Sequence, residues 1–166
     1  MKFTFLFFLL FPLFIQAQDC NLSSETDPYT KEKKLSTGFI SLRGGSIIID
    51  ADNKEIDVMF SIQGADKCYD NTSTAEIYFE GLKSRTTSRN GGTMNCEGLF
   101  HFIFRNSRST PVTLLKRMCT MKMTQIVFTG NDAKKTKTVL TVTPDIQAAL
   151  MKQVNCLVEE ARGLIK

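Results

Sequence analysis

The sequence contains no tryptophan, a single histidine and no Cys-x-x-Cys pair, and it has neither an internal repeat nor a low-complexity tract. One histidine cannot complete a Cys2His2 set, so the cysteines are not expected to hold structural zinc. The lack of tryptophan also argues against a stacking platform for sugars. We therefore predict no metal ion and no cofactor.

An excess of charge of one sign is lacking too. Lys2 falls in the segment assigned below to export, so 20 of the 21 Lys and Arg remain against 17 Asp and Glu, a formal charge of +3. Such a small excess does not indicate a nucleic-acid or membrane-surface partner. Neither is expected.

A long apolar run occurs only at the start of the chain. Residues 3–15 follow the positive charge of Lys2 and lead to the small residue Ala17, which predicts a signal peptide over residues 1–17. The run is too short to span a bilayer comfortably, and no later stretch is apolar enough to do so. We expect a secreted or periplasmic protein with no membrane span after cleavage. The acidic Asp19 before Cys20 favours a free protein over a lipoprotein.

All five cysteines follow the signal peptide, and export to an oxidising compartment favours disulfides. Cys68 and Cys96 flank a predicted hairpin, made of extended runs over residues 74–80 and 83–89. Between them Gly81 and Leu82 form a two-residue loop, and glycine at its first position is typical of a type II′ turn.

The register of this hairpin supports a Cys68–Cys96 disulfide. It sets Ile77 opposite Thr86, and further out it sets Cys68 opposite Asn95. One extra residue among the glycines of segment 90–92 would then bring Cys96 opposite Cys68. We predict that this bridge closes the open end of the hairpin.

A second disulfide must come from Cys20, Cys119 and Cys156. Pairing of Cys119 with Cys156 is preferred, because it would tie the last helix to the sheet. Cys20 would then be the unpaired cysteine on a mobile N-terminus.

Period-two alternation and turn residues predict an α+β fold, mainly an antiparallel sheet of about seven to eight strands. A short helix starts at Thr110-Pro111, and an amphipathic C-terminal helix over residues 144–162 packs on the sheet. After the signal peptide, residues 18–35 form an N-terminal arm and residues 36–166 a single domain. The remaining predicted strands cover residues 39–42, 46–50, 56–62, 98–105, 121–129 and 136–143.

Four short motifs carry a resemblance to a group of proteins. They are Asp-Pro-Tyr-Thr-x-Glu-Lys from residue 27, Lys-Cys-Tyr-Asp from residue 67, Asn95-Cys96, and Asn-Cys-Leu from residue 155. In this order the chain resembles small uncharacterised exported bacterial proteins. The resemblance implies export, a compact β-rich domain and the Cys68–Cys96 bridge, and it implies no activity and no catalytic residue.

Three sets of residues are candidates for a catalytic or metal-binding role. His101 alternates with phenylalanines, which indicates a strand-face residue rather than a catalytic base. Asp50, Asp52 and Asp57 begin like a calcium loop, but Glu55 and Ser61 stand where an EF-hand needs Gly and Glu. A hairpin turn is favoured there, with a weak surface calcium site as the alternative.

Asp66, Asp70 and Asn71 surround Cys68, where a carboxylate pair would suit glycoside hydrolysis. Turn chemistry explains them more simply, since Asp and Asn side chains bond their own backbone. No catalytic residue is therefore assigned. Asn21 and Asn71 begin glycosylation sequons, which matter only if the source has that machinery.

Basic residues occur in two groups, but without interleaved aromatics they do not support stacking on bases. A solvated face or a blunted strand edge is preferred. These residues are Arg85, Arg89, Arg105 and Arg108, and separately Lys134, Lys135 and Lys137.

The leading functional hypothesis is a non-catalytic binding or interaction module, with an envelope or extracellular protein or ligand as its partner. One alternative is a small secreted hydrolase, which a deep pocket holding Asp66, Asp70 or His101 would favour. Another is an envelope structural protein or inhibitor, which would show a protruding loop or an exposed apolar patch.

Overall fold

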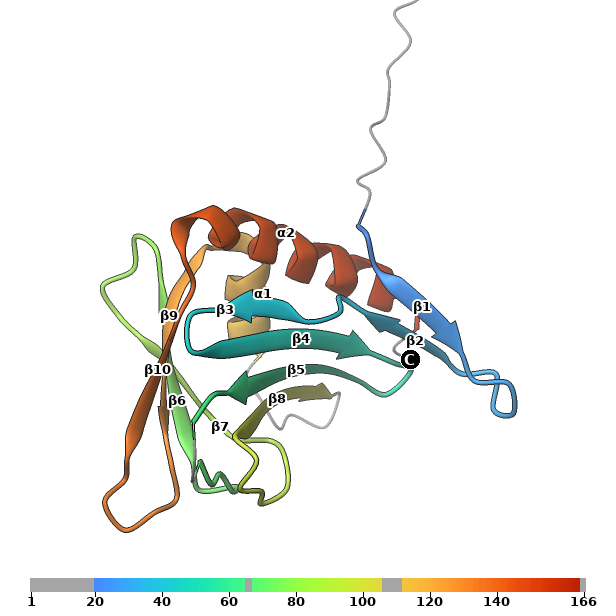
Figure 1. Ribbon diagram of the computed structural model, residues 1–166. Helices are drawn as coiled ribbons and strands as arrows, with labels where there is room; N and C mark the ends of the chain where they lie inside the picture. Colours follow the sequence, from blue (N-terminus) through green and yellow to red (C-terminus); the bar gives the residue numbers. More distant parts are fainter. Residues whose placement is uncertain (1–19, 65–66, 106–111, 165–166) are drawn as a thin grey trace, which may run out of the picture.

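The computed structural model describes residues 20–64, 67–105 and 112–164, and within them it contains ten strands and two helices (Figure 1). In chain order these are β1 (Ser23–Thr26), β2 (Lys33–Ser36), β3 (Ile40–Leu42), β4 (Gly45–Ala51), β5 (Glu55–Ile62), β6 (Thr74–Phe79), β7 (Thr86–Arg89), β8 (Leu99–Arg105), α1 (Val112–Thr120), β9 (Met123–Thr129), β10 (Lys137–Thr141) and α2 (Pro144–Ala161).

The strands form two antiparallel sheets, so the predicted α+β class is confirmed. One sheet has the order β1-β2-β4-β5-β8, with β3 paired to β4 beside β2. The other has the order β10-β9-β6-β7. An isolated bridge between Arg43 and Thr141 links the two sheets. The strand number exceeds the predicted seven to eight because β1 and β2 lie in the segment assigned to an arm.

The core lies between the two sheets and under α2. Strict alternation in β4 and β5 puts every second side chain inside, as the sequence predicted for residues 56–62. Aromatic rings from both sheets meet at the centre of this core, where Phe60, Phe100, Phe102 and Phe128 are fully buried and pack edge to face or tilted.

The C-terminal helix α2 lies across the strands of the six-stranded sheet (Figure 1). Its apolar stripe buries Leu150, Val154 and Leu157, which are at most 1% exposed. Thr143 is the N-cap residue of this helix, but its side chain makes no capping hydrogen bond. The Thr110-Pro111 start predicted for the short helix lies outside the described residues.

The hairpin between Cys68 and Cys96 has the predicted register but a different loop. Ile77 pairs with Thr86, as predicted. The two-residue type II′ loop is wrong, because β6 ends at Phe79 and β7 begins at Thr86. The Leu82 N–H instead donates to the Phe79 carbonyl at 3.3 Å, and Gly81 adopts a positive φ of 77° inside this wider turn.

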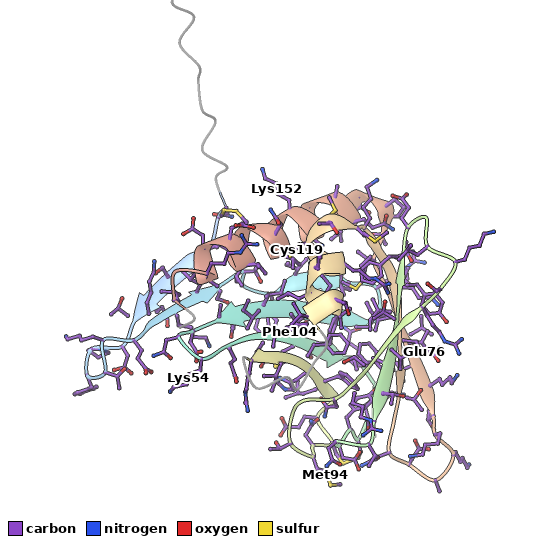
Figure 2. All side chains as sticks on the ribbon, turned by 180° about the vertical axis from the view of Figure 1, so that it is seen from behind. Lys54, Glu76, Met94, Phe104, Cys119 and Lys152 are labelled. Carbon is purple, nitrogen blue, oxygen red and sulfur yellow. A yellow bond between two sulfur atoms is a disulfide. The ribbon has the colours of Figure 1, made fainter. Side chains whose placement is uncertain are left out.

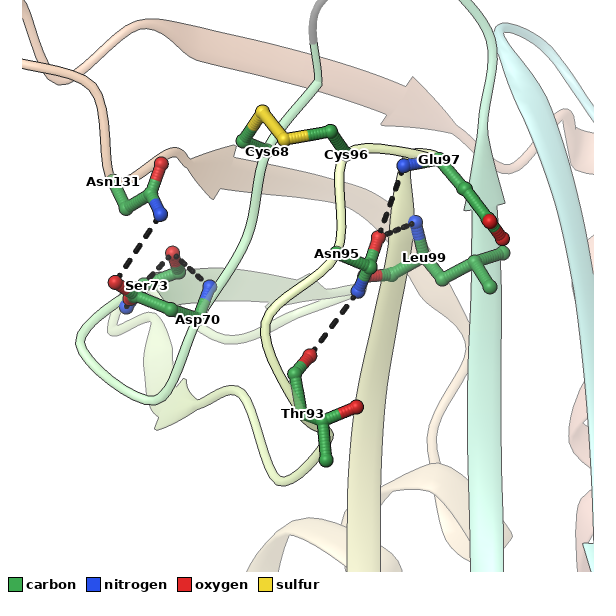
Figure 3. Close-up of a disulfide and its surroundings, with 9 residues drawn as sticks. All are labelled: Cys68, Asp70, Ser73, Thr93, Asn95, Cys96, Glu97, Leu99 and Asn131. Atoms are coloured by element: carbon green, nitrogen blue, oxygen red, sulfur yellow. Dashed lines mark hydrogen bonds between the residues drawn. A yellow bond between two sulfur atoms is a disulfide. The ribbon is translucent and has the colours of Figure 1, made fainter.

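The extra residue predicted beyond this hairpin is also present. The Asn90 N–H donates to Ser73 O in the original register, whereas Tyr69 pairs with Asn95, one residue further on. The shift brings Cys68 and Cys96 together in a disulfide with a Cα–Cα distance of 3.9 Å. Figure 3 shows this bridge beside Asn95.

The segment after β7 covers the edge of β8. The Asn90 side-chain oxygen accepts the His101 N–H at 2.8 Å, and the Asn95 side chain bonds both the N–H and the carbonyl of Leu99. These amides occupy backbone groups that would otherwise pair with another strand. This explains why Asn90, a polar residue, is only 5% exposed.

The N-terminal arm is a β-hairpin fixed by the second disulfide. β1 and β2 pair over four residues, and β2 continues onto β4 through only two pairs, Leu35–Ala51 and Ser36–Asp50. Cys20 forms its disulfide with Cys156 of α2, and Cys119 is free. The predicted Cys119–Cys156 pair is therefore wrong, because the unpredicted hairpin brings Cys20 back across α2.

Candidate functional site

The outer face of the six-stranded sheet carries most of its polar side chains. Alternation that sends Ile49, Val58 and Phe102 into the core sends the residues between them outward. The outward residues of β4, β5 and the edge strand β8 are Ser46, Ile48, Asp50, Glu55, Asp57, Met59, Ser61, Leu99, His101, Ile103 and Arg105.

Two carboxylates stand directly opposite each other on this face. Asp50 of β4 pairs with Asp57 of β5 in the sheet register. Opposite residues of an antiparallel pair have Cβ atoms about 5 Å apart, and like charges at such positions destabilise the sheet. An arrangement that costs stability in the middle of a sheet is a signature of a functional surface.

Each of the two carboxylates has one cationic or hydrogen-bonding partner. Lys34 Nζ lies 2.9 Å from Asp50 Oδ2. His101 Nδ1 lies 2.8 Å from Asp57 Oδ2, across the β5–β8 pair. Asp50 Oδ1 is buried and has no hydrogen-bond partner among the described residues.

A groove runs from this carboxylate pair to the β1–β2 hairpin. Three adjoining hollows of about 120, 170 and 350 Å³ all include Lys34 in their lining. We call them together the acidic groove, because their lining holds seven carboxylates and two lysines. The carboxylates are Glu25, Asp27, Glu32, Asp50, Asp52, Glu55 and Asp57, and the lysines are Lys33 and Lys34.

The tip of the β1–β2 hairpin projects beyond the body of the protein (Figure 1). Asp27 Oδ1 accepts the N–H groups of Tyr29 and Thr30 at 2.8 and 2.7 Å, and the Lys31 N–H donates to Asp27 O at 2.9 Å. The backbone hydrogen bonds from Thr30 and Tyr29 hold the pKa of Asp27 below its usual value. The turn is therefore fixed locally, and it presents the Tyr29 ring at 92% exposure.

The hairpin tip is also tied to the turn between β4 and β5. The Asn53 side-chain amide donates to Glu32 Oε1 at 2.9 Å, and Lys54 Nζ lies 3.7 Å from the same oxygen. Asp52 Oδ1 in turn accepts the N–H groups of Lys54 and Glu55. The turn over residues 52–54 is a capped hairpin turn, and it forms the end of the acidic groove.

The calcium alternative for Asp50, Asp52 and Asp57 is not supported. These residues do lie together, but Lys34 already occupies one oxygen of Asp50, and Asp52 bonds its own turn. Among the described residues no group of three or more His, Cys, Asp or Glu side chains is arranged to hold a metal ion.

His101 has an acidic partner that the sequence did not reveal, because Asp57 is 44 residues away and only the strand register unites them. The other edge of the ring is covered by the backbone. A methyl group added at Gly92 would come within 2.6 Å of His101 Cδ2 and 3.4 Å of Nε2. Gly92 therefore packs against the Cγ–Cδ2 side of the ring, and 19% of the His101 side chain remains exposed.

The other candidate residues do not converge on a common site. Asp70 bonds Thr72, Ser73 and Asn131, and Asp66 lies outside the described residues. The hydroxyl and N–H of Thr72 lower the pKa of Asp70 from 3.8 to about 2. Asp70 is thus a turn residue, as the sequence indicated, and Figure 3 shows its contact with Asn131.

The basic residues of the sequence are also dispersed. Arg85 pairs with Glu76 in the four-stranded sheet, whereas Arg105 pairs with Glu55 in the six-stranded one. Arg108 lies outside the described residues. Arg89 is exposed on β7, and Lys134, Lys135 and Lys137 are exposed at the β9–β10 loop.

The free thiol of Cys119 lies on α1 beneath α2 (Figure 2). Burial raises the pKa of this thiol to about 11, so it is protonated at neutral pH. A protonated thiol is a poor nucleophile, and Cys119 is a packing residue.

No protein-family model matches the chain, and neither a curated protein nor a solved structure is significantly similar to it. None of the helices in the described part of the chain has the length and apolar character needed to cross a bilayer.

Proposed function

We propose that the protein is a non-catalytic binding module, secreted or periplasmic, that holds a cationic segment of a partner protein in its acidic groove. The observation that carries this proposal is the pair Asp50 and Asp57, opposed on neighbouring central strands inside that groove. A cationic side chain placed between them would relieve their repulsion, so the site is complementary to Lys or Arg.

The hairpin tip supports the same role. An exposed tyrosine on a backbone that is already fixed loses little conformational freedom on binding, and tyrosine is enriched among residues that dominate binding energy. Tyr29 stands at the end of the hairpin that lines the groove. A partner whose basic segment fills the groove would meet this ring.

The two disulfides support export, since such bonds persist in oxidising compartments. The Cys20–Cys156 bond also bears on anchoring, because a sulfur held in a disulfide does not carry a lipid. We therefore propose a free protein rather than a lipoprotein. An intact-mass measurement of the mature chain that finds an added diacylglycerol would contradict this.

The hydrolase alternative is favoured by one observation, the Asp57–His101 pair, which resembles two thirds of a catalytic triad. Against it, no serine or cysteine among the described residues is hydrogen-bonded to His101, whose bonds go to Asn90 and Asp57. The inhibitor alternative gains from the protruding hairpin. However, its tip is a closed turn with Lys31 at φ 61°, and an inhibitor that mimics a substrate needs an extended loop.

The test measures binding of a lysine-rich decapeptide to the mature protein by calorimetry at low and physiological salt. The double variant Asp50→Asn/Asp57→Asn should bind at least about tenfold more weakly, since each charge-assisted contact contributes about 1.5–3 kcal/mol. Glu97→Gln, which removes an exposed carboxylate outside the groove, is the matched control and should bind like the wild type. Equal binding by the double variant and the wild type would refute the proposal.

Two further variants separate the alternatives. Tyr29→Ala should weaken capture of a natural partner from envelope extract while leaving the fold intact by circular dichroism. His101→Gln should fold and keep that capture. If His101→Gln loses capture of the partner while Tyr29→Ala keeps it, and His101→Gln still binds the lysine-rich peptide, the result would instead favour the hydrolase alternative.

A further inference from the structure

A separate cavity lies between the Cys68 segment and the β9–β10 loop. This loop is at the opposite end of the molecule from the β1–β2 hairpin (Figure 1). The cavity has a volume of about 240 Å³. This volume has room for a small ligand such as a single sugar ring. Its lining is Lys67, Cys68, Tyr69, Gly130, Asn131, Asp132, Thr136 and Thr138.

The walls of this cavity are held by hydrogen bonds of their own. The Asn131 side-chain amide donates to Asp70 Oδ2 at 3.2 Å (Figure 3), and the Gly130 N–H donates to Thr136 O at 3.0 Å. The Cys68–Cys96 disulfide fixes the facing segment. The cavity is therefore largely formed before any ligand enters, as is usual for small-molecule sites.

Tyr69 is one of the residues that line the cavity. Tyr69 is 2% exposed, and its ring packs against Phe100 and Phe128 at centroid distances of 5.4 and 6.2 Å. Burial raises the pKa of Tyr69, although the hydroxyl of Thr138 bonds the phenol and opposes this. The phenol thus remains a neutral hydroxyl that both donates and accepts.

The two charged residues of the lining, Lys67 and Asp132, differ in their hydrogen-bond and ion-pair partners. Asp132 accepts the N–H and the hydroxyl of Thr136, at 2.9 and 2.8 Å, and these bonds lower its pKa. Its remaining lone pairs can accept hydroxyl groups of a ligand. No described residue forms an ion pair with Lys67, so its ammonium group can take a carboxylate.

We propose that this cavity binds a small hydroxylated carboxylic acid the size of a single uronic acid. Its carboxylate would bind Lys67, and its hydroxyl groups would bond Asp132, Thr136 and Thr138. The site shares no residue with the acidic groove, so it stands or falls independently of the binding function proposed above.

The test is a titration of the isotope-labelled mature protein with D-glucuronate, followed by amide chemical shifts, with D-glucose as the neutral control. Glucuronate should shift the amides of residues 67–69 and 130–138, with a dissociation constant of about 1 mM or below. Glucose should bind at least about tenfold more weakly, because it lacks the charge that Lys67 recognises. Lys67→Met should remove this difference, whereas Lys152→Met on α2 should leave it unchanged.

A second variant guards against loss of the fold. Thr138→Val keeps the shape of the side chain but removes its hydroxyl, and it should weaken glucuronate binding by about tenfold without moving core amide shifts. Equal binding of glucose and glucuronate, shifts outside these residues, or no binding by the wild type would each overturn the proposal.

Discussion

Two β-hairpins of the protein are each held in place by a disulfide, and they are attached to the rest of the molecule in different ways. The β6–β7 hairpin is bridged locally, by cysteines 28 residues apart, and β6 lies inside the four-stranded sheet between β7 and β9. The β1–β2 hairpin is bridged across the chain, by cysteines 136 residues apart, and it meets the six-stranded sheet through only two pairs of residues.

This difference matches what the two regions expose. β6 buries Ala75, Ile77 and Phe79 in the core, whereas all four residues of β1 are exposed. A hairpin that buries little apolar surface cannot hold its place by packing, so the remote disulfide supplies the constraint. The weakly packed hairpin is also the one that presents Tyr29 and lines the acidic groove. Ligand-binding elements often belong to the less stable parts of a fold.

The largest expected effect comes from removing the remote bridge. Cys20→Ser/Cys156→Ser should lower the free energy of unfolding by about 5 kcal/mol in the chain-entropy model, because the closed loop spans most of the chain. Urea denaturation followed by circular dichroism measures it. If the loss is smaller than that for the local bridge, the β1–β2 hairpin separates from the sheet before the rest unfolds.

The next largest difference is expected in the stability lost when a buried side chain of each hairpin is truncated to alanine. Ile77→Ala should cost about 4 kcal/mol, because Ile77 is fully buried in the central region of its sheet. Leu35→Ala on β2 should cost about 2 kcal/mol, since the edge hairpin can adjust around the smaller side chain. Thermal melts of both variants test this order, and equal shifts would show that the hairpins are packed alike.

Removing the local bridge should have a smaller effect than removing the remote one. Cys68→Ser/Cys96→Ser should cost roughly 3–4 kcal/mol, because the closed loop is shorter. Hydrogen exchange should show faster opening near residues 67–73 and 90–96, with β1 and β2 unchanged. Peptide mapping without reductant that finds Cys68 or Cys96 bonded elsewhere would contradict the assignment itself.

The smallest expected effect is on the stability of the fold at acidic pH. Hydrogen bonds from Thr72 lower the folded-state pKa of Asp70 from 3.8 to about 2. A lowered carboxyl pKa stabilises the fold above pH 4 and loses that contribution as the pH falls towards 2. Asp70→Asn should therefore flatten the acid side of the stability profile in this interval. Asp27→Asn at the tip of the β1–β2 hairpin should act in the same direction, and a steeper acid limb in either variant would refute the argument.

Much of the local structure was predictable because it depends on neighbours in sequence. Alternation placed the buried side of β5, and the apolar stripe placed Leu150 and Leu157 of α2 in the core. The register of the β6–β7 hairpin followed from counting residues between its two runs. Its loop was misjudged, since Gly81 takes a positive φ in more than one kind of turn.

The candidate sites were predictable only in part. The sequence drew attention to Asp50 together with Asp57 and, separately, to His101, and it gave no reason to connect His101 with Asp57. The polar residues of β1 and β2 carry no apolar alternation, so nothing in them indicated strands. The dipeptide Asp27-Pro28, whose residue types favour a turn, was the one local sign of the hairpin.

By itself the sequence determined the elements whose stability is local: the alternating strands, the amphipathic helix and the turn chemistry of Asp27 and Asp70. Tertiary structure alone decided the partner of Cys156, the meeting of Asp57 with His101 and the acidic groove. These depend on which strands become neighbours, and strand order is fixed by burial of the whole core rather than by any one segment. Contacts between residues 44 or 136 positions apart follow from that order, and a single sequence carries no separate signal for them.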